Sequence, residues 1–243
     1  PYLVHHIALI RRLYGWVAAR LSGTAPVVNK LEGLGQAFCG TGMVEGLVRQ
    51  GLIMACRLLF RGKHNCSFVE NADDQAFLVS RIGLPEHQAV LIRGIGVDEQ
   101  RFRYHDEQAQ AVPAVVMVSR LLWPKGVREL VEAGRILRAR GLDVQIRLVG
   151  KPDDASSVSV PEADLQAWHD QGDIEWLGHR DDIAQIWAQA TIAVLPSYYR
   201  EGIPRSLLEA ASCGRPVVTT DMPGCREIVE NGVNGYLVVP RDV

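Results

Sequence analysis

Short apolar runs alternate with longer amphipathic segments along most of the chain, a pattern typical of β-strands followed by α-helices. In the second half, the apolar runs predict strands over residues 114–118, 144–149, 174–177, 191–195, 217–220 and 236–239. The segments between them predict helices over residues 126–140, 162–170, 181–190, 204–213 and, more briefly, 225–230. Such alternation favours a parallel sheet with right-handed crossovers, as in Rossmann-like α/β domains.

The first hundred residues show the same alternation. Predicted helices cover residues 8–21, 43–60 and 73–82, and predicted strands cover residues 26–31, 67–69 and 89–92. The polar stretch 94–113 is poor in aliphatic side chains and is interpreted as a linker. We therefore expect one domain over residues 1–112, linker included, and a second over residues 113–243. Both ends of the chain look cut, so the first domain is expected to be incomplete.

The stretch from Pro196 to Pro216 carries the main candidate chemistry. Pro204 and Gly214 stand where a first helical residue and the residue after a helix are typical. The loop before this helix therefore meets free backbone N–H groups, which favour phosphate. Glu201 precedes the helix and Glu209 lies within it, and carboxylates accept hydrogen bonds from hydroxyl groups. The prediction is a site for phosphate and polyol together, as in a sugar nucleotide.

Two basic residues, Arg120 and Lys125, follow the first strand of the second half. Ligands of Rossmann-like folds bind beyond the carboxyl ends of the strands. Two cations there would clamp a diphosphate and offset the charge that develops as it leaves. Other residues predicted at such strand ends are Ser119, Gly150, Gly178 and Pro196.

These motifs resemble the signature of family 4 (group 1) glycosyltransferases of the GT-B fold. The resemblance is carried by E-G-I-P-R-S-L-L-E at 201–209, by V-S-R-L-L-W-P-K-G at 118–126, and by segments 178–182, 221–227 and 231–235. It covers nearly the whole chain, and the bacterial capsular and lipid-linked-oligosaccharide subgroup is the most similar. It implies two Rossmann-like domains facing a cleft, the N-terminal one incomplete.

The resemblance implies a hexosyltransferase that moves a sugar, with retention of configuration, from a nucleotide sugar to a lipid-linked or growing polysaccharide acceptor. A UDP-sugar donor is expected, with no cofactor and no metal. Two alternatives stay open: a GT-B-fold UDP-sugar epimerase, and a non-catalytic module that binds nucleotide sugars.

The same resemblance implies roles for individual residues. Arg120 and Lys125 would hold the nucleoside diphosphate. Glu201 would hold the donor sugar and Glu209 the ribose, and the expected catalytic residues are Arg120, Lys125 and Glu201. Backbone N–H groups near Gly202 would hold the distal phosphate or sugar, to which Pro204 cannot contribute. The expected donor-binding residues are Gly202, Ile203, Pro204, Arg205, Glu209, Gly150 and Gly178.

The glycine-rich loop 32–42 would face the acceptor through Glu32, Gly33 and Gly35. Related sequences often carry His or Thr in place of Glu32, which is either an acceptor-side base or an ordinary loop acid. A rival interpretation is a dinucleotide fingerprint in G-T-G-M-V-E-G at 40–46. It is disfavoured because the motif does not directly follow a strand and the nearest suitable acid is Glu70.

Composition narrows the setting. A formal net charge of −2 over 243 residues argues against a nucleic-acid partner. The five cysteines form no C-x-x-C pair, which favours free thiols in a reducing compartment. His64 and Cys66 are close, but two potential ligands do not make a metal site. No stretch reaches the length of a membrane span and no signal peptide is visible, so a cytoplasmic location is expected.

The predicted helix 43–60 has two interpretations: it either contacts a membrane surface or packs in the core of the first domain. Its predicted core-facing residues are Val44, Leu47, Val48, Leu52, Ala55 and Leu59. Ile53 and Phe60 are predicted to be exposed, and the basic residues of the helix and the segment just after it are Arg49, Arg57, Arg61 and Lys63. This basic, partly apolar face suits peripheral contact with the cytoplasmic face of the inner membrane. The favoured alternative is a core helix with solvated arginines.

Overall fold

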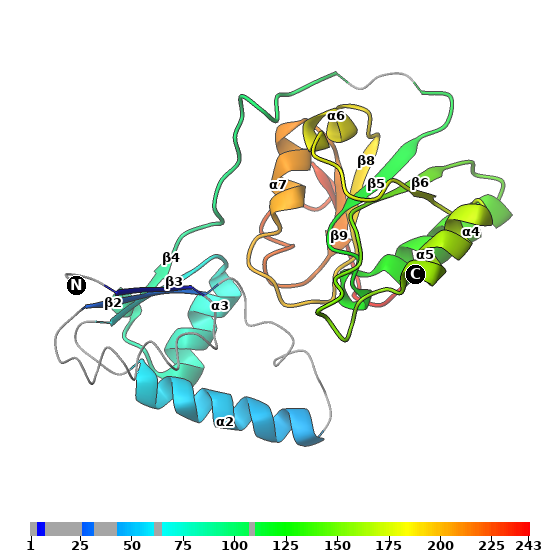
Figure 1. Cartoon of the computed structure of the whole chain (residues 1–243). Coiled ribbons are helices and arrows are strands. Elements are labelled where there is room, and N and C mark those ends of the chain that lie inside the picture. Colours follow the sequence, from blue (N-terminus) through cyan, green and yellow to red (C-terminus); the bar gives the residue numbers. More distant parts are fainter. Residues whose placement is uncertain (1–3, 8–25, 32–42, 61–64, 107–109) are drawn as a thin grey trace. The chain divides into compact units, whose positions relative to one another are not determined.

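The computed structural model describes residues 4–7, 26–31, 43–60, 65–106 and 110–243. The chain divides into two units (Figure 1), and each is considered by itself. The first comprises Pro1–Ile95 with Arg200–Ile203, and the second comprises Gly96–Tyr199 with Pro204–Val243.

The polar stretch taken as a linker, residues 94–113, falls mostly in the second unit, whereas it was predicted to close the first domain. The reason is burial, because Phe102 is 2 % exposed and belongs to the second unit's core. The hydroxyl of Ser212 donates to the Phe102 carbonyl oxygen at 2.6 Å, and the Arg215 guanidinium donates to the carbonyl of His105. One buried aromatic side chain thus fastens a stretch that is otherwise polar.

Within its described residues, the first unit contains a four-stranded parallel sheet in the order β1-β2-β3-β4. Its strands are β1 (Val4–Ile7), β2 (Val27–Leu31), β3 (Asn65–Val69) and β4 (Ala89–Leu91). Its helical segments are α2 (Met43–Leu59), α3 (Ala72–Phe77), the π-helix η2 (Leu78–Ile82) and the 3-10 helix η3 (Glu86–Gln88). Strand β1 was not predicted, and the predicted helix 8–21 lies outside the described residues.

The buried side of α2 differs in part from the prediction, although Ala55 packs against the core as predicted. Ile53 and Phe60 are 8 % and 3 % exposed and pack in the core of the first unit. Leu47 and Val48, assigned to the core, are 70 % and 52 % exposed. Apolar residues recur at helical spacing on two sides of this segment, so periodicity alone does not select the buried side. Packing against Leu78 and its neighbours selects it.

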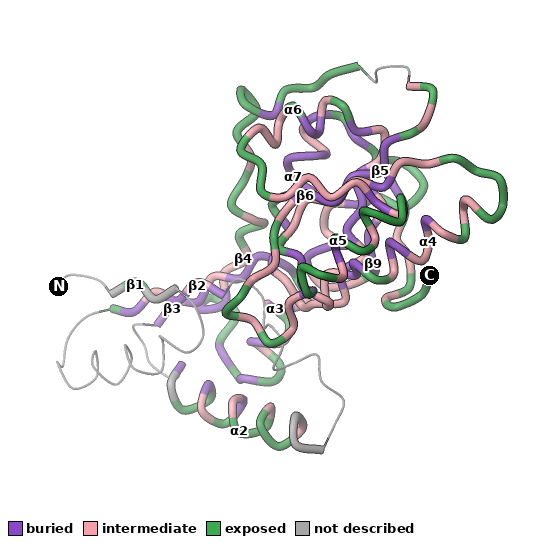
Figure 2. The backbone as a smooth tube through the Cα atoms, turned by 45° about the vertical axis from the view of Figure 1, so that its right-hand side comes forward, coloured by how far each residue is buried: buried purple, intermediate pink, exposed green. Residues whose placement is uncertain are grey.

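The second unit is a six-stranded parallel sheet in the order β10-β9-β8-β5-β6-β7. Its strands are β5 (Ala114–Val118), β6 (Gln145–Val149), β7 (Glu175–Trp176), β8 (Ile192–Leu195), β9 (Val217–Thr220) and β10 (Gly235–Val238). Its helices are the 3-10 turn η4 (Trp123–Lys125), α4 (Val127–Ala139), α5 (Glu162–Asp170), α6 (Ile183–Ala188) and α7 (Arg205–Ser212). Helices α4 and α5 lie on one side of the sheet and α6 and α7 on the other (Figure 1), which leaves the central strands buried (Figure 2). The doubly wound α/β fold is confirmed.

The short helix predicted at residues 225–230 is wrong, since this stretch consists of turns. The Asn234 side chain accepts from the Glu230 N–H at 2.8 Å and donates to the Ile228 carbonyl at 2.9 Å. Side-chain hydrogen bonds thus replace the helical ones.

An ion-pair cluster joins α4 to the segment before β7. Asp173 contacts Arg135 at 2.6 Å and Arg138 at 2.9 Å, and only 10 % of its side chain is exposed. The Arg135 hydrogen bond, followed by the charges of both arginines, holds the pKa of Asp173 below the ordinary 3.8. These contacts lie near the amino ends of the strands, so they bear on stability.

Replacing Asp173 by asparagine is expected to lower the free energy of unfolding at pH 7 by about 2 kcal/mol, the size of a hydrogen bond to a charged group. A lowered folded-state pKa means that the contribution is complete above pH 3.8 and is lost as the pH falls through the folded pKa. Urea unfolding should therefore give wild-type and variant curves that converge in acid. The exposed Asp143→Asn is the control, and a constant gap down to the lowest pH would contradict the assignment.

Candidate functional site

The strand order of the second unit reverses between β5 and β8, and Rossmann-like folds bind ligands beyond the carboxyl ends of strands at such a point. The loops that follow these two strands touch. Gly126 has φ 83°, and a Cβ there would lie 2.2 Å from the carbonyl oxygen of Pro196. The Tyr198 N–H donates to the Pro124 carbonyl at 2.9 Å. The sheet topology and these contacts bring the predicted strand ends together.

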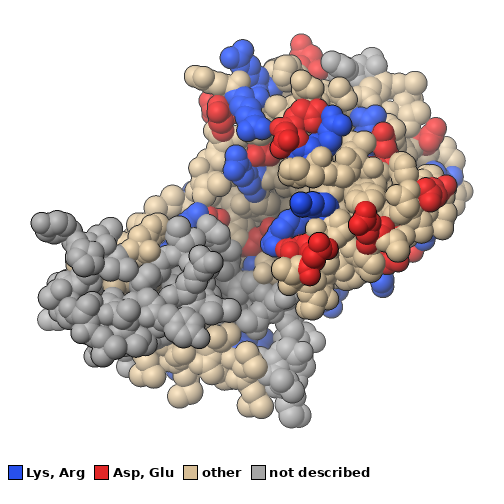
Figure 3. Space-filling view, in the orientation of Figure 1, with Lys and Arg blue, Asp and Glu red and all other residues tan. Residues whose placement is uncertain are grey.

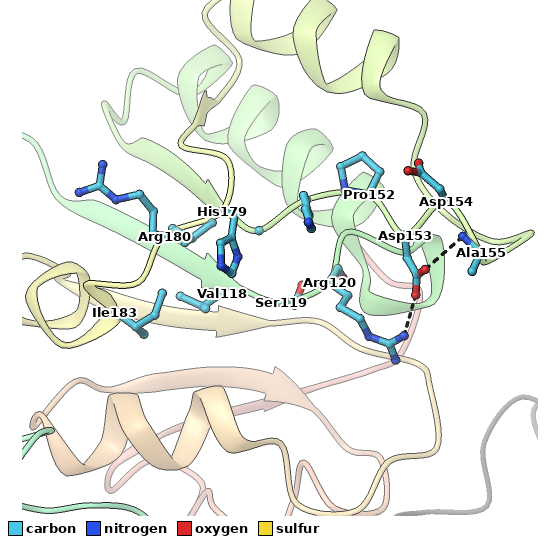
Figure 4. A pocket seen from close by; sticks show the side chains of 13 residues that line it. Val118, Ser119, Arg120, Pro152, Asp153, Asp154, Ala155, His179, Arg180 and Ile183 are labelled. Atoms are coloured by element: carbon cyan, nitrogen blue, oxygen red, sulfur yellow. Dashed lines mark hydrogen bonds and ion pairs between the residues drawn. The ribbon is translucent and has the colours of Figure 1, made fainter. Parts of the chain in front are cut away.

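A cavity of about 730 Å³ opens beside this point, between the loops after β5, β6 and β7 (Figure 4). Arg120 and Gly150, both predicted site residues, line it. The other residues in its wall are Val118, Ser119, Val149, Lys151, Pro152, Asp153, Asp154, Ala155, His179, Arg180 and Ile183. Lys125 does not line this cavity.

Gly150 allows the loops after β5 and β6 to meet. Its φ is 139°, and an added Cβ would lie 1.9 Å from the carbonyl oxygen of Ser119. Its N–H donates to the Gly178 carbonyl at 2.8 Å, and its own carbonyl accepts from the indole N–H of Trp176 at 3.0 Å. The wall of the cavity is therefore built from close backbone contacts, and the two predicted glycines are hydrogen-bonded to each other.

Arg120 is paired with Asp153, which was not predicted. The guanidinium Nη1 lies 2.9 Å from Asp153 Oδ2, as Figure 4 shows, and 64 % of the arginine side chain is exposed. The Asp153 Oδ1 accepts from the Ala155 N–H at 3.2 Å. The strand-end position of Asp153, four residues after β6, was the available signal. An exposed cation on a structured loop is accessible to an anionic ligand.

Lys125 ends the 3-10 turn η4, and its ammonium lies 5.8 Å from the centre of the Tyr199 ring. Tyr199 follows β8, so this contact again links the loops after β5 and β8. On the face drawn in Figure 3, basic and acidic side chains of the second unit lie beside one another. On this face an anion would therefore meet individual cations and not a broad basic surface.

Helix α7 begins one residue later than predicted. Pro204 has φ −62° and ψ 117°, so it is the N-cap and Arg205 is the first helical residue. Gly214 follows the helix with φ 78°, as its position predicted. Glu209 is 8 % exposed and lies 2.9 Å from Arg205 Nε. Burial raises the pKa of Glu209, and the charge of Arg205 partly opposes this.

The segment Arg200–Ile203, just before this helix, is held by residues that follow β3. The Ile203 N–H, predicted to meet a phosphate, donates to Glu70 Oε2 at 3.1 Å. The carbonyl of Glu201 accepts from the Asn71 amide at 3.1 Å. Sequence reasoning missed Glu70 and Asn71 as partners, because no local pattern connects residues so far apart.

The sequence comparisons identify the family. Residues 112–243 match the family described as "Glycosyl transferases group 1". The chain belongs to this family. The group 1 glycosyltransferase is 30 % identical over 234 residues to N,N'-diacetylbacillosaminyl-diphospho-undecaprenol alpha-1,3-N-acetylgalactosaminyltransferase of Campylobacter jejuni. That match covers 91 % of this chain and 59 % of the relative. A putative colanic acid biosynthesis glycosyltransferase, WcaL of Salmonella typhimurium, is 31 % identical over 170 residues, 66 % of this chain and 41 % of WcaL.

Solved structures show the GT-B fold. Sucrose-phosphate synthase from Thermosynechococcus elongatus superposes with a TM-score of 0.81 at 22 % identity, over 99 % of this chain and 61 % of that protein. Anabaena HepE, solved with UDP, superposes with a TM-score of 0.73 at 20 % identity, over 98 % of this chain and 65 % of HepE. The group 1 glycosyltransferase chain thus spans about three fifths of the length of its first relatives.

Some predicted residues fall outside the described parts of the chain. These are Glu32, Gly33 and Gly35, together with Gly40 and Gly42 of the rival dinucleotide motif. Within the described residues of this glycosyltransferase, no three His, Cys, Asp or Glu side chains are grouped as a metal site.

Proposed function

We propose that this group 1 glycosyltransferase moves a sugar from a UDP-sugar to a lipid-linked or growing polysaccharide, with retention of configuration. The observation that carries the proposal is the cavity beside the β5–β8 switch point, with Arg120 in its wall. The named specificity of the Campylobacter relative and the UDP bound to HepE support the acceptor and donor classes.

In this proposal the second unit holds the nucleotide. The base lies against Gly150 and His179 in the cavity wall, next to Gly178, whose carbonyl accepts from the Gly150 N–H. The buried carboxylate of Glu209 accepts from the ribose hydroxyls. Arg120 leaves Asp153 to meet the diphosphate, since a doubly charged phosphate outcompetes an exposed carboxylate for a guanidinium.

The reaction needs charge stabilisation as the sugar–phosphate bond breaks. We assign this to Arg120 and Lys125, whose fixed cations offset the charge of the departing diphosphate without a divalent metal or another cofactor. Glu201 is assigned to the donor sugar's hydroxyls. The remaining donor contacts are assigned to Gly202 and Arg205, together with the side chains of Ile203 and Pro204, because the Ile203 N–H is taken by Glu70 and Pro204 has no N–H. The acceptor side is assigned to Glu32, Gly33 and Gly35.

Calorimetry on this chain with UDP, ADP and GDP, with and without EDTA, tests the donor. The expected result is preferential UDP binding that EDTA leaves unchanged and that Arg120→Ala weakens. Transfer is then assayed on the full-length protein with a lipid-linked saccharide. Binding without transfer would favour a non-catalytic module, and an epimerised donor without acceptor would favour an epimerase. No binding of any nucleotide would overturn the proposal.

Glu209→Gln is expected to weaken UDP binding about tenfold, through loss of a charged hydrogen-bond acceptor. Only the ionised carboxylate accepts fully from the ribose, and burial raises the Glu209 pKa. Wild-type affinity should therefore fall on acidification at a higher pH than for an ordinary glutamate, whereas the amide variant should lack this step. Titrations across the acid range measure it, with exposed Glu162→Gln as the control. The same pH profile in Glu209→Gln and wild type would contradict the role.

We also propose peripheral contact between the first unit and an anionic membrane surface on the cytoplasmic side. Leu47, Met54 and Leu58 are 70 %, 63 % and 68 % exposed, and their spacing puts them on one side of α2. Arg57 and Arg81 are exposed nearby, joined by a hydrogen bond from Arg57 Nε to the Arg81 carbonyl at 2.8 Å. None of the helices described is long and apolar enough to cross a bilayer.

Flotation of the full-length protein with phosphatidylglycerol vesicles at low salt tests this contact. Wild type should float and a Leu47→Glu/Met54→Glu variant should not. The control is Leu142→Glu, which changes an exposed leucine of the second unit. Equal flotation of the wild type and the α2 variant, or none with either, would reject the contact.

A further inference from the structure

Three polar residues that follow β3 converge on the loop that carries Glu201. Asp74 Oδ1 lies 3.0 Å from Arg200 Nε and 2.9 Å from its Nη2. The Asn71 amide donates to the Glu201 carbonyl at 3.1 Å. All of these residues belong to the first unit. Arg200 and Glu201 are therefore hydrogen-bonded to the N-cap and the first turn of α3.

The third contact involves Glu70. Its Oε2 accepts from the Ile203 N–H at 3.1 Å, and its Oε1 lies 3.2 Å from the Lys30 ammonium. Gly202 makes this approach possible, since an added Cβ would lie 2.0 Å from Oε2. Glycine is needed here for the proximity of the carboxylate, and Lys30 compensates the charge that is drawn in.

Because these polar side chains are buried, each of them needs hydrogen-bond or ion-pair partners. Asn71 and Asp74 are fully buried and Glu70 is 7 % exposed. A buried carboxylate is costly unless it is paired and hydrogen-bonded. Asp74 meets this need through Arg200 and through the Asn71 amide at 3.0 Å. The Arg200 guanidinium also lies 5.6 Å from the centre of the Phe77 ring.

Capping of α3 explains only part of the network. Asn71 Oδ1 accepts from the Asp74 N–H at 2.8 Å, which completes the helix cap. The cap needs neither Glu70 nor the pairing of Asp74 with Arg200. Glu70 and Asp74 instead bind the loop Arg200–Ile203, which lies between β8 and α7 in the sequence.

We propose that Glu70, Asn71 and Asp74 are positioning residues that hold the Arg200 side chain and the backbone of Glu201 and Ile203, and so aim the Glu201 carboxylate. The inference rests on the proposed function, in which Glu201 meets the donor sugar. Asn71 binds the carbonyl of Glu201, Asp74 binds the side chain of Arg200, and Glu70 binds the N–H of Ile203. Loss of any one of these three contacts lets the Glu201 carboxylate move, while the nucleotide contacts assigned to the second unit are retained.

The test uses Glu70→Gln, Arg200→Gln and Arg200→Lys in the full-length protein, with exposed Glu86→Gln as the matched control. Glu70→Gln and Arg200→Gln are expected to lower kcat about 10- to 100-fold, the range for a misplaced catalytic group. The Kd for UMP, which lacks the distal phosphate, should stay at the wild-type value, because the base and the ribose are assigned to the second unit. Arg200→Lys should recover part of kcat, and Glu86→Gln should match wild type. Wild-type kcat in both folded glutamine variants would overturn the inference.

Hydrogen exchange gives a readout that is independent of the reaction. The Ile203 amide should be protected in the wild type and should exchange faster in Glu70→Gln and in Gly202→Ala, whose Cβ expels the carboxylate. Gly202→Ala also leaves the buried Asp74 intact, so it serves if the other variants fold poorly. Unchanged exchange of the Ile203 amide in both variants would contradict the hydrogen bond between Glu70 and Ile203. Failure of wild-type protein to bind UDP would instead overturn the proposed function.

Discussion

Replacing Lys125 by alanine is expected to slow sugar transfer about 100- to 1,000-fold while the second unit stays folded. Removing one preorganised group that stabilises developing charge costs about 3–4 kcal/mol of transition-state stabilisation. Lys125 ends the short turn η4, and its ammonium lies 5.8 Å from the Tyr199 ring centre, so its loss removes a cation where the loops after β5 and β8 meet.

Steady-state kinetics on the full-length protein measure this effect. The expected loss is in kcat, with a smaller change in the UDP Kd, and Lys125→Arg should keep part of the rate. Arg140→Ala, at the other end of α4, removes an exposed cation and should leave the rate unchanged. A wild-type rate in Lys125→Ala, or in Glu201→Ala, would refute the assignment of these residues.

Replacing Gly126 by alanine is expected to destabilise the second unit by more than about 3 kcal/mol, in the range of strained core substitutions. Two effects add. The φ of 83° disfavours any side chain by about 1–2 kcal/mol. The added Cβ would also lie 2.2 Å from the Pro196 carbonyl oxygen, so the loops after β5 and β8 must separate.

Gly141→Ala is the matched control. Gly141 has a similar φ of 77° and follows the other end of α4, but nothing lies within 4 Å of its added Cβ. Urea unfolding of the two variants should differ by more than the shared backbone cost, and only Gly126→Ala should also lose UDP affinity. Equal destabilisation would mean that the close approach at the switch point carries no energy.

The second unit was predictable because its signals are local. Continuous apolar runs such as Ala114–Val118 mark buried strands, and Gly141 and Gly214 stand after helices at positions that need a positive φ. Position after a predicted strand pointed to Arg120 and Gly150, and both line one cavity. The predicted helix at 225–230 failed because turn contacts from Asn234 replace helical hydrogen bonds.

The first unit was less predictable because its decisions are not local. Both sides of α2 are apolar, and only packing in the core selects Ile53 over Leu47. The polar stretch 94–113, predicted to close the first domain, belongs mostly to the second unit because Phe102 is buried in that unit's core. No local sequence pattern predicts the burial of Phe102.

By itself, the sequence determined the alternation of strands and helices, the turns that need glycine, and the residue types at the strand ends, because each depends on neighbours within a few positions. Only the tertiary structure decided the partners: Asp153 for Arg120, Glu70 for the Ile203 N–H, and Asp74 for Arg200. Such pairs join residues tens of positions apart, and their geometry exists only once the backbone is folded and water is excluded from the buried carboxylates.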